Sequence, residues 1–317
     1  MVSIVVLNWN GRRFIDPFMA SFEKQTYPHS EIELLFVDNG SSDGSVSYLE
    51  KNYAATPNLR VIKNGDNYGY AGGNNRGMRH AKGQYVLVCN NDLVLDKNLV
   101  SELVNVAREK NAAATVPKLM YLNKPGIINN AGSRLAPDSD WPVYEDGANE
   151  KDTGQFDTTR EITAFCGACV LFSREFLNKV GMFDRKFFLY FEDGDLSWRG
   201  QKAGYRFFYA PKAVALHAHT GSTTEGSPIF NYYVGRNRLL ILLKNAKFKV
   251  FLRGLAKTLR DHIMLRLKNL YRALRGRYSK RQAWHEFILS QKMLWATLLL
   301  SPYILLKRWR LIKEETL

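Results

Sequence analysis

Apolar and polar positions alternate in blocks along the first hundred residues. Four apolar stretches, each followed by polar residues rich in Asn, Asp or Gly, cover residues 4–7, 34–37, 59–62 and 85–89. The segments between them have the length and spacing of helices. Strands that alternate with helices in this way predict a mostly parallel α/β sheet. Because open α/β sheets bind ligands at the carboxyl ends of their strands, we expect the site there.

The second half of the chain follows a different pattern. Residues 120–160 are rich in loop-forming residues, and the sequence after Pro228 is typical of helix. Apolar residues recur at steps of three or four at positions 248, 251, 252, 255, 259, 263, 267, 270 and 274. This predicts an amphipathic helix. A further apolar run, 293–306, contains Pro302 and is shorter than the roughly 20 residues needed to span a bilayer.

The charge lies almost entirely in this helical tail. Residues 236–317 contain 20 Lys and Arg against 4 Asp and Glu, whereas the remaining 235 residues contain 25 and 26. We therefore expect a near-neutral domain over residues 1–235 and a basic helical region over 236–317. An anionic partner of the tail is predicted, and an anionic membrane surface in contact with residues 246–317 fits the interleaved Trp, Tyr and Leu.

The cysteines and the first residues of the chain indicate where in the cell the protein is located. The three cysteines form no disulfide framework, and the first residues lack the basic and apolar regions of a secretory signal. Both features predict a location on the cytoplasmic face of the cell membrane, with peripheral attachment. One alternative for the basic tail is an ordinary helix pair that packs on the near-neutral domain and has a solvated basic face. The other is a nucleic-acid-binding protein. That alternative gives no reason for the carboxylates described below, so we expect no nucleic-acid partner.

Polar residues at the predicted strand ends are the first candidates for the site. Asn8 and Asn10 follow the first apolar stretch, and Asp38 follows the second in the sequence FVDNGSSDGS. A carboxylate there can accept hydrogen bonds from a base or ribose, and a flexible turn lets the backbone approach a ligand. An Asx turn is the structural alternative.

The segment NYGYAGGNNRG, residues 67–77, combines glycines, amides and one cation. Asn67, Gly72, Asn74 and Arg76 suit a phosphorylated ligand, although the spacing differs from the dinucleotide-binding pattern. Asn91 and Asp92 follow the fourth apolar stretch. Asp92 is suited to hold a divalent cation such as Mg²⁺ or Mn²⁺ among mixed oxygen ligands, and Asn91 is a candidate for binding the donor. A helix cap is the alternative for Asp92.

A third group joins carboxylates to aromatic side chains in FFLYFEDGDLSWR, residues 187–199. Taken together, IVVLNWNG, FVDNGSSDGS, NYGYAGGNNRG, NND, FCGACVLFSRE, FFLYFEDGDLSWRG and LHAHTGS resemble family-two glycosyltransferases, which are inverting enzymes with the GT-A fold. The motifs recur in the family's order over roughly residues 2–240. Among the members, the bacterial rhamnosyltransferases of cell-surface polysaccharide synthesis are the most similar in motif.

The resemblance implies a role for each candidate. Asp193 is the general base that takes the proton of an acceptor hydroxyl, and its aromatic neighbours raise its basicity by desolvation. Glu192 orients the loop or the acceptor. For Asp195 a helix cap is the expected role.

For the donor, the resemblance implies a nucleotide-diphospho-sugar bound by Asn8, Asn10, Asp38, Asn67 and Asn74. Gly167 and Ala168 line the donor-sugar and acceptor cavity. Asp92 holds a divalent metal on the diphosphate, with His217 as a further ligand; His219, two residues on, is an open alternative.

The sequence departs from the family at Asn90-Asn91-Asp92, where many members have Asp-x-Asp. With one anionic ligand fewer, part of the neutralisation is expected from Arg76, Arg236 or Arg238. The departure favours a dTDP-rhamnose donor, with a UDP-hexose as the alternative. A glycan acceptor, carried on a polyprenyl diphosphate, suits the basic tail. A nucleotidyltransferase is a further alternative, but the lysine-rich glycine loop that it needs is missing.

Overall fold

The computed structural model describes residues 1–219, 226–275 and 279–316. The chain divides into two compact units. The first comprises Met1–Leu135 and Val143–Ser222, and the second comprises Ala136–Pro142 and Thr223–Leu317. The second unit therefore takes a short segment from within the loop-rich region as well as the basic tail.

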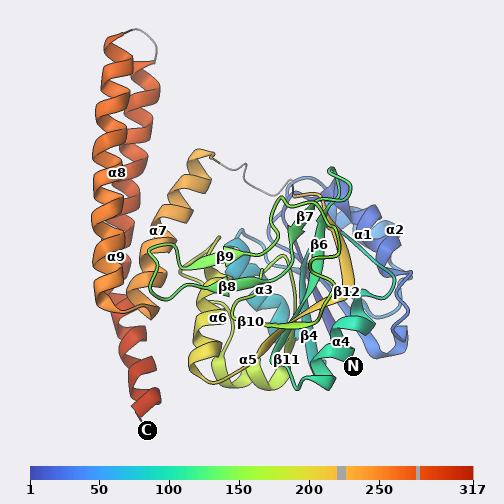
Figure 1. Cartoon of the computed structure of the whole chain (residues 1–317). Helices are drawn as coiled ribbons and strands as arrows, with labels where there is room; N and C mark the ends of the chain where they lie inside the picture. The colour runs from blue at the N-terminus through green and yellow to red at the C-terminus, as the bar shows by residue number, and fades with distance from the viewer. Residues whose placement is uncertain (220–225, 276–278, 317) are drawn as a thin grey trace. The chain divides into compact units, whose positions relative to one another are not determined.

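Strands and helices alternate through the first half of the first unit, as the apolar blocks predicted (Figure 1). Its strands are β1 (Val2–Asn8), β2 (Ile32–Asp38), β3 (Leu59–Lys63), β4 (Tyr85–Asn90), β5 (Leu93–Leu95), β6 (Ala114–Tyr121), β7 (Ile128–Asn130), β8 (Ser133–Leu135), β9 (Val143–Glu145), β10 (Arg160–Ile162), β11 (Cys169–Ser173) and β12 (Phe207–His217). Its helices are α1 (Ile15–Phe22), α2 (Ser45–Asn52), α3 (Gly69–His80), α4 (Leu99–Glu109), α5 (Arg174–Val180) and α6 (Glu192–Lys202), with the short 3₁₀ turns η1 (Arg12–Phe14) and η2 (His29–Glu31).

One mixed sheet organises this unit, with strands in the order β10-β12-β6-β11-β4-β1-β2-β3. β3, β2, β1 and β4 are parallel neighbours, and β12 is parallel to β6. β11 is antiparallel to both β4 and β6. The carboxyl ends of β1, β2, β4, β6 and β12 therefore lie at the same edge as the start of β11. This edge carries the candidate residues.

Helices cover both faces of the sheet. One buried cluster joins alternate residues of β1 and β2, such as Ile4 and Phe36, to α1, α2 and α4. The other joins the opposite residues, such as Val5 and Val37, to α3, α5 and α6. Strands buried on both faces read as continuous apolar runs, which is why the sequence pattern revealed them.

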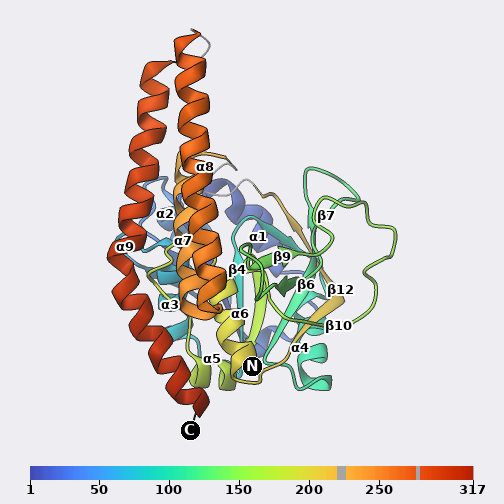
Figure 2. The same cartoon turned by 60° about the vertical axis from the view of Figure 1, so that its left-hand side comes forward.

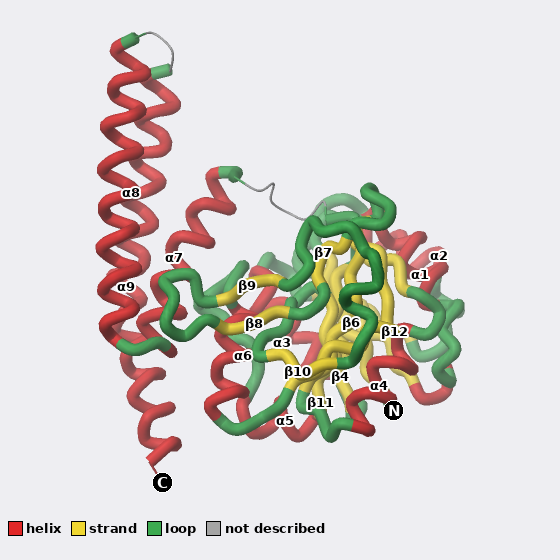
Figure 3. The backbone as a smooth tube through the Cα atoms, viewed as in Figure 1, coloured by secondary structure: helices red, strands yellow, loops and turns green. Residues whose placement is uncertain are grey.

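The loop-rich region expected over 120–160 holds the short strands β7, β8 and β9 joined by longer loops (Figure 3). Lys118 of β6 fixes it, because its buried Nζ pairs with Asp152 at 2.9 Å and with Asp157 at 2.5 Å. The insertion is thus tied to the central sheet by charge, by the pairing of β7 with β6, and by buried apolar residues such as Ile128 and Ala131.

The described part of the second unit is helical, as the sequence predicted. Its helices are α7 (Pro228–Asn245), α8 (Phe248–Leu274) and α9 (Lys280–Thr316). Ser227 caps α7, since its hydroxyl accepts from Phe230 N–H at 3.2 Å. Helices α8 and α9 run side by side in opposite directions, which Figure 2 shows from a second angle.

The predicted apolar stripe of α8 is only partly buried. Phe251 is packed inward, whereas Phe248, Leu259, Ile263 and Leu267 are exposed. The side chains of Leu270 and Leu274 lie outside the described residues. In α9 the stretch Phe287–Trp309 is long and apolar enough to cross a membrane by length and composition, and only 17% of it is buried. Both helices therefore present large apolar side chains to solvent.

Candidate active site

Amide and carboxylate side chains at the ends of β1, β2 and β4 form one hydrogen-bonded group. The register pairs Asn8 with Asp38, and Asn8 Nδ2 donates to Asp38 Oδ1 at 3.0 Å. Asn91 Nδ2 donates to Asn8 Oδ1 at 2.6 Å. Asn8 Nδ2 and the Asn10 backbone N–H both donate to Ser41 Oγ, at 3.1 and 2.9 Å. The structure thus brings together four of the residues predicted for the donor.

The first turn of α3 is attached to this group by Asn39, a residue that was not among the predicted candidates. Asn39 Nδ2 donates to Asn67 Oδ1 at 3.0 Å and to the carbonyl of Gly69 at 3.2 Å. Its Oδ1 accepts from Asn64 Nδ2 at 3.0 Å. Asn39 follows Asp38 directly, so its place in the chain was the available signal.

The other predicted residues of α3 are Asn74, Arg76 and Gly72, and they make different contacts. Asn74 is fully buried, and its Oδ1 has no hydrogen-bond partner in the described structure. The Arg76 guanidinium donates to the carbonyl of Asn64 at 3.2 Å and lies over the ring of Tyr68 at 4.0 Å. Gly72 packs against Tyr68, because an added Cβ would lie 2.8 Å from the Tyr68 Cβ.

Asp193 is held at the same sheet edge by two backbone donors. Gly167, just ahead of β11, donates its N–H to Asp193 Oδ2 at 2.9 Å. The N–H of Gly194 donates to Oδ1 at 2.7 Å. Asp193 is half-buried, whereas Ala168, which follows Gly167 in the chain, is buried and its carbonyl accepts from Asn90 N–H at 2.9 Å. Both carboxylate oxygens are therefore fixed, and the group keeps access to solvent.

The two adjacent carboxylates have different electrostatic environments. Burial raises the pKa of Asp193, in the direction that its aromatic neighbours predicted, while the N–H groups of Gly167 and Gly194 oppose that shift. Burial raises the pKa of Glu192 well above its ordinary value, and the charge of Asp193 raises it further. Glu192 Oε2 is buried without a hydrogen-bond partner among the described residues. Ionisation is therefore disfavoured more strongly at Glu192 than at Asp193.

Residues 187–191, which we call the aromatic loop, precede α6 and have an unusual backbone. Phe188, Tyr190 and Phe191 have φ angles of 65°, 68° and 67°, in the left-handed region that bulky residues rarely adopt. The carbonyl of Phe188 accepts from Ala71 N–H at 3.2 Å. Gly69 faces this carbonyl so closely that an added Cβ would lie 2.4 Å from it. The loop that delivers Asp193 thus packs directly on the first turn of α3.

The expected capping role of Asp195 is wrong. Helix α6 begins at Glu192, so Asp195 lies inside its first turn and is fully buried. Its Oδ2 accepts from Arg199 Nε at 3.0 Å, one turn along the helix. Arg199 also donates to the carbonyls of Val180 and Met182, at 2.6 and 2.7 Å. Asp195 therefore orients Arg199, which holds the chain at Val180 and Met182 ahead of the aromatic loop.

Asp92 and His217 meet at the carboxyl ends of β4 and β12. His217 Nε2 lies 3.2 Å from Asp92 Oδ1, and both residues are buried. The other carboxylate oxygen, Asp92 Oδ2, is buried without a hydrogen-bond partner in the described residues. His217 Nδ1 lies 2.8 Å from Asn129 Oδ1, a contact that would leave Nε2 free to coordinate a metal.

This pair fits a divalent cation but does not form a complete site. Across the described ranges, no cluster of three or more His, Cys, Asp or Glu side chains is suited to a metal ion. Further ligands would have to come from the substrate or water. The ring of His219 makes edge-to-face contacts with the rings of His217 and Tyr121, with centroids 5.3 and 5.5 Å apart. His217 has the direct contact with Asp92. The Gly221-Ser222 part of the motif lies outside the described residues.

The two predicted arginines of the tail belong to the second unit. Both are buried in α7. Arg236 Nε donates to Asn237 Oδ1 at 2.8 Å. The Arg238 guanidinium donates to Thr258 Oγ1 at 2.5 Å and to the carbonyl of Asp140 at 3.2 Å. Arg238 thus links α7, α8 and the segment Ala136–Pro142 within that unit, and the donor-binding role of both residues stays a prediction.

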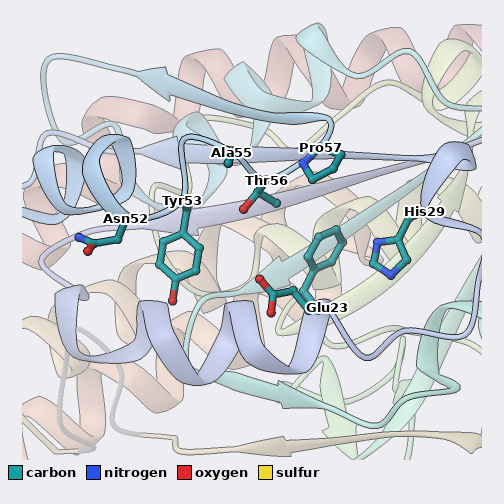
Figure 4. Close-up of a pocket in the computed structure, with 8 residues that line it drawn as sticks. Glu23, His29, Asn52, Tyr53, Ala55, Thr56 and Pro57 are labelled. Carbon is teal, nitrogen blue, oxygen red and sulfur yellow. The ribbon is translucent and has the colours of Figure 1, made fainter.

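A separate surface pocket lies on the α1 and α2 side of the first unit (Figure 4). It is lined by Phe22, Glu23, His29, Asn52, Tyr53, Ala55, Thr56 and Pro57. These residues include none of the candidates above. These residues include the carboxylate Glu23 and no Lys or Arg, so the pocket lacks the cations expected for a diphosphate.

The solved structures that resemble this chain share its fold. A structure of GalNAc-T7 with UDP, GalNAc and Mn²⁺ matches with a TM-score of 0.61 at 18% identity, over 77% of this chain and 48% of that one. The mannosyltransferase PcManGT from Pyrobaculum calidifontis, in complex with GDP-Man and Mn²⁺, matches with a TM-score of 0.55 at 16% identity, over 95% of this chain and 87% of that one. The GT-A fold expected from the motifs is confirmed.

Sequence relatives point the same way. N-acetylglucosaminyl-diphospho-decaprenol L-rhamnosyltransferase of Mycobacterium tuberculosis is 26% identical, over 84% of this chain and 93% of its own length. The low-salt glycan biosynthesis hexosyltransferase Agl10 of Haloferax volcanii is 24% identical, over 75% of this chain and 74% of its own. The model of the family described as glycosyl transferase family 2 matches residues 3–181. That match covers more than half of the chain, which therefore belongs to glycosyl transferase family 2.

Proposed function

We propose that the protein is an inverting glycosyltransferase in which Asp193 is the general base. The acceptor hydroxyl oxygen attacks the anomeric carbon of the donor sugar while its proton passes to the Asp193 carboxylate. The bond from the anomeric carbon to the diphosphate oxygen breaks, and the nucleoside diphosphate leaves with the electron pair. Attack from the side opposite the leaving group inverts the configuration.

The observation that supports this role is the hydrogen bonding of Asp193. Two backbone N–H groups, from Gly167 and Gly194, favour its ionised form, while burial keeps its basicity above that of an ordinary carboxylate. A base needs both properties at neutral pH. Burial and the charge of Asp193 both raise the pKa of Glu192, which disfavours a second negative charge beside the acceptor.

We assign the leaving diphosphate to the part of the same sheet edge that carries Asp92 and His217. We infer that Asp92 and His217 would hold a divalent cation, which would neutralise the developing charge of the diphosphate. Asn8, Asn10, Asp38, Asn67 and Asn74 surround the nucleoside and diphosphate in this proposal. Arg76 has hydrogen-bonding capacity left for a phosphate, since among the described residues its guanidinium makes one hydrogen bond, to the carbonyl of Asn64.

For the donor sugar we propose rhamnose, carried on a deoxythymidine diphosphate. The support is the Asn-Asn-Asp sequence at the end of β4 and the similarity to the mycobacterial rhamnosyltransferase. A polyprenyl-diphosphate-linked glycan is the proposed acceptor class. A UDP-hexose donor is the competing outcome of the test below.

The test is a transfer assay with a panel of nucleotide sugars, run with Mn²⁺, with Mg²⁺ and with EDTA. We expect one donor to give product with inverted anomeric configuration by NMR, and EDTA to abolish the activity. Transfer from a UDP-hexose alone would replace the donor assignment. Retention of configuration would refute the base role of Asp193.

We further propose that α8 and α9 bind the cytoplasmic face of the membrane peripherally. Exposed apolar side chains such as Trp295 and Leu299, which are 61% and 76% exposed, stand among many cations. Trp and Leu suit the boundary between headgroups and acyl chains, and Lys and Arg suit anionic lipid.

Two charge reversals in exposed lysines test this attachment. Lys292 lies in α9 and Lys51 lies in α2. Because each cation near an anionic surface contributes about 1 kcal/mol, Lys292→Glu should weaken binding to phosphatidylglycerol vesicles several-fold, whereas Lys51→Glu should not. Equal effects would contradict the proposal. Release of the protein by alkaline carbonate separates peripheral attachment from a membrane-crossing helix.

A further inference from the structure

The first turn of α3 holds both segments that surround Asp193. Tyr70 donates its hydroxyl to the carbonyl of Gly167, and Gly167 in turn donates its N–H to Asp193 Oδ2 at 2.9 Å. On the other side, Ala71 donates its N–H to the carbonyl of Phe188, in the loop that leads to the same carboxylate. One turn of helix therefore contacts the chain before β11 and the chain before α6.

The contact between Tyr70 and Gly167 is close and fixed. A Cβ added to Gly167 would lie 3.0 Å from the Tyr70 hydroxyl oxygen and 3.3 Å from two of its ring carbons. The ring packs against Phe183 with centroids 5.7 Å apart. Asn75 binds both backbone groups of Phe183, donating at 2.7 Å and accepting at 3.1 Å. The tyrosine ring is thus restrained by Phe183 as well as by Gly167.

We propose that Tyr70 is a positioning residue for the base, acting through Gly167. Its hydroxyl fixes the residue whose N–H fixes Asp193, so that the carboxylate points at the acceptor position. This inference rests on the proposed role of Asp193. The Gly167 N–H also lowers the pKa of the Asp193 carboxyl against the effect of burial, so a displaced Gly167 would raise that pKa.

The test compares Tyr70→Phe with Tyr209→Phe in the full-length protein. Tyr209 is fully buried in β12, and its hydroxyl has no hydrogen-bond partner in the described structure, so Tyr209→Phe controls for the loss of a buried hydroxyl. For Tyr70→Phe we expect kcat to fall by about 5- to 100-fold with donor Kd unchanged. The acidic limb of the pH profile of kcat should move to higher pH. Tyr209→Phe should change neither.

A double-mutant cycle isolates the contact itself. Gly167→Ala should reduce kcat less in the Tyr70→Phe background than in the wild type, because the closest atom to the new Cβ has been removed. Additive effects, or a loss of kcat in Tyr70→Phe without a shift of the acidic limb, would overturn the proposal.

Amide hydrogen exchange at Gly167 provides a readout that needs no activity. We expect faster exchange in Tyr70→Phe and unchanged exchange in Tyr209→Phe. Unchanged exchange in Tyr70→Phe would refute the positioning role even if transfer by the wild type is normal. If exchange is faster in Tyr70→Phe but the wild type transfers sugar from none of the donors, the proposed function fails while the contact between Tyr70 and Gly167 is established.

Discussion

Replacing Asp193 with Asn separates the chemical role of this residue from its structural role. The carboxylate accepts from Gly167 N–H at 2.9 Å and from Gly194 N–H at 2.7 Å. An Asn side chain offers one oxygen, so one of the two N–H groups must face an NH₂ group. An unsatisfied buried donor costs about 1–3 kcal/mol of folding free energy. Asn also removes a carboxylate whose ionised form is disfavoured by burial, so the net loss should be smaller than this.

The expected effect on the reaction is larger than the effect on stability. A general base contributes about 10²- to 10⁴-fold to the rate, which corresponds to about 3–5 kcal/mol of activation free energy. Asp193→Asn should therefore lower the single-turnover rate by that factor. Donor Kd should stay within a few-fold, because none of the residues assigned to the nucleotide bonds to Asp193 in the contacts above.

The assay measures single-turnover transfer and calorimetric donor binding at a temperature where both proteins are folded. Asp16→Asn is the control for the chemical change, since Asp16 is an exposed carboxylate that bonds Tyr48 and Tyr53 in the first unit. A rate above about one tenth of the wild-type value for Asp193→Asn would refute the base assignment. So would a loss of rate explained entirely by weaker donor binding.

Three further variants test neighbouring parts of the site. Glu192→Gln should be more stable than the wild type, and the difference should grow with pH above the ordinary carboxyl range, because the folded wild type binds a proton that the unfolded chain has released. The expected slope is about 1.4 kcal/mol per pH unit until the raised pKa of Glu192 is reached. Urea unfolding from pH 5 to 8 measures this difference, and a gain in stability that shrinks with pH would contradict it. Asp92→Asn should raise the Mn²⁺ concentration for half-saturation by about tenfold or more in titrations followed by electron paramagnetic resonance, and an unchanged titration would remove Asp92 as a ligand. Gly69→Ala should lose more stability than Gly65→Ala, because a Cβ at Gly69, whose φ is 68°, would clash with Phe188. Gly65 has a φ of 76° and nothing within 4 Å of an added Cβ, so its replacement costs only the roughly 1–2 kcal/mol of a left-handed backbone. Equal losses would show that the aromatic loop moves away from the new Cβ at little cost.

The part of the candidate site that the local apolar pattern predicted lies at the ends of parallel strands. Asn8, Asp38 and Asp92 follow apolar runs, and parallel strands bring their carboxyl ends to one edge whatever the order of the strands. Local pattern is sufficient for such residues. The same holds for the amphipathic α8, whose apolar period is visible without tertiary information.

The residues that the sequence did not reveal act across long separations. Tyr70 contacts Gly167, and His217 contacts Asn129, in pairs 97 and 88 positions apart. Nothing in the local pattern around Tyr70 or Asn129 distinguishes them from loop or helix residues. The capping prediction for Asp195 failed for a related reason, since a carboxylate near a helix start suits a cap until burial beside Arg199 is known.

The strained aromatic loop gives a physical reason for the direction in which Asp193 points. Three left-handed residues cost about 1–2 kcal/mol each, and a relaxed loop would let α6 begin at another residue. A helix turns by about 100° per residue, so a start displaced by one position would swing the carboxylate away from the Gly167 N–H. The bond from Ala71 to Phe188 and the anchor supplied by Arg199 oppose that relaxation. Strain in the backbone and the orientation of the base are therefore two consequences of one packing arrangement.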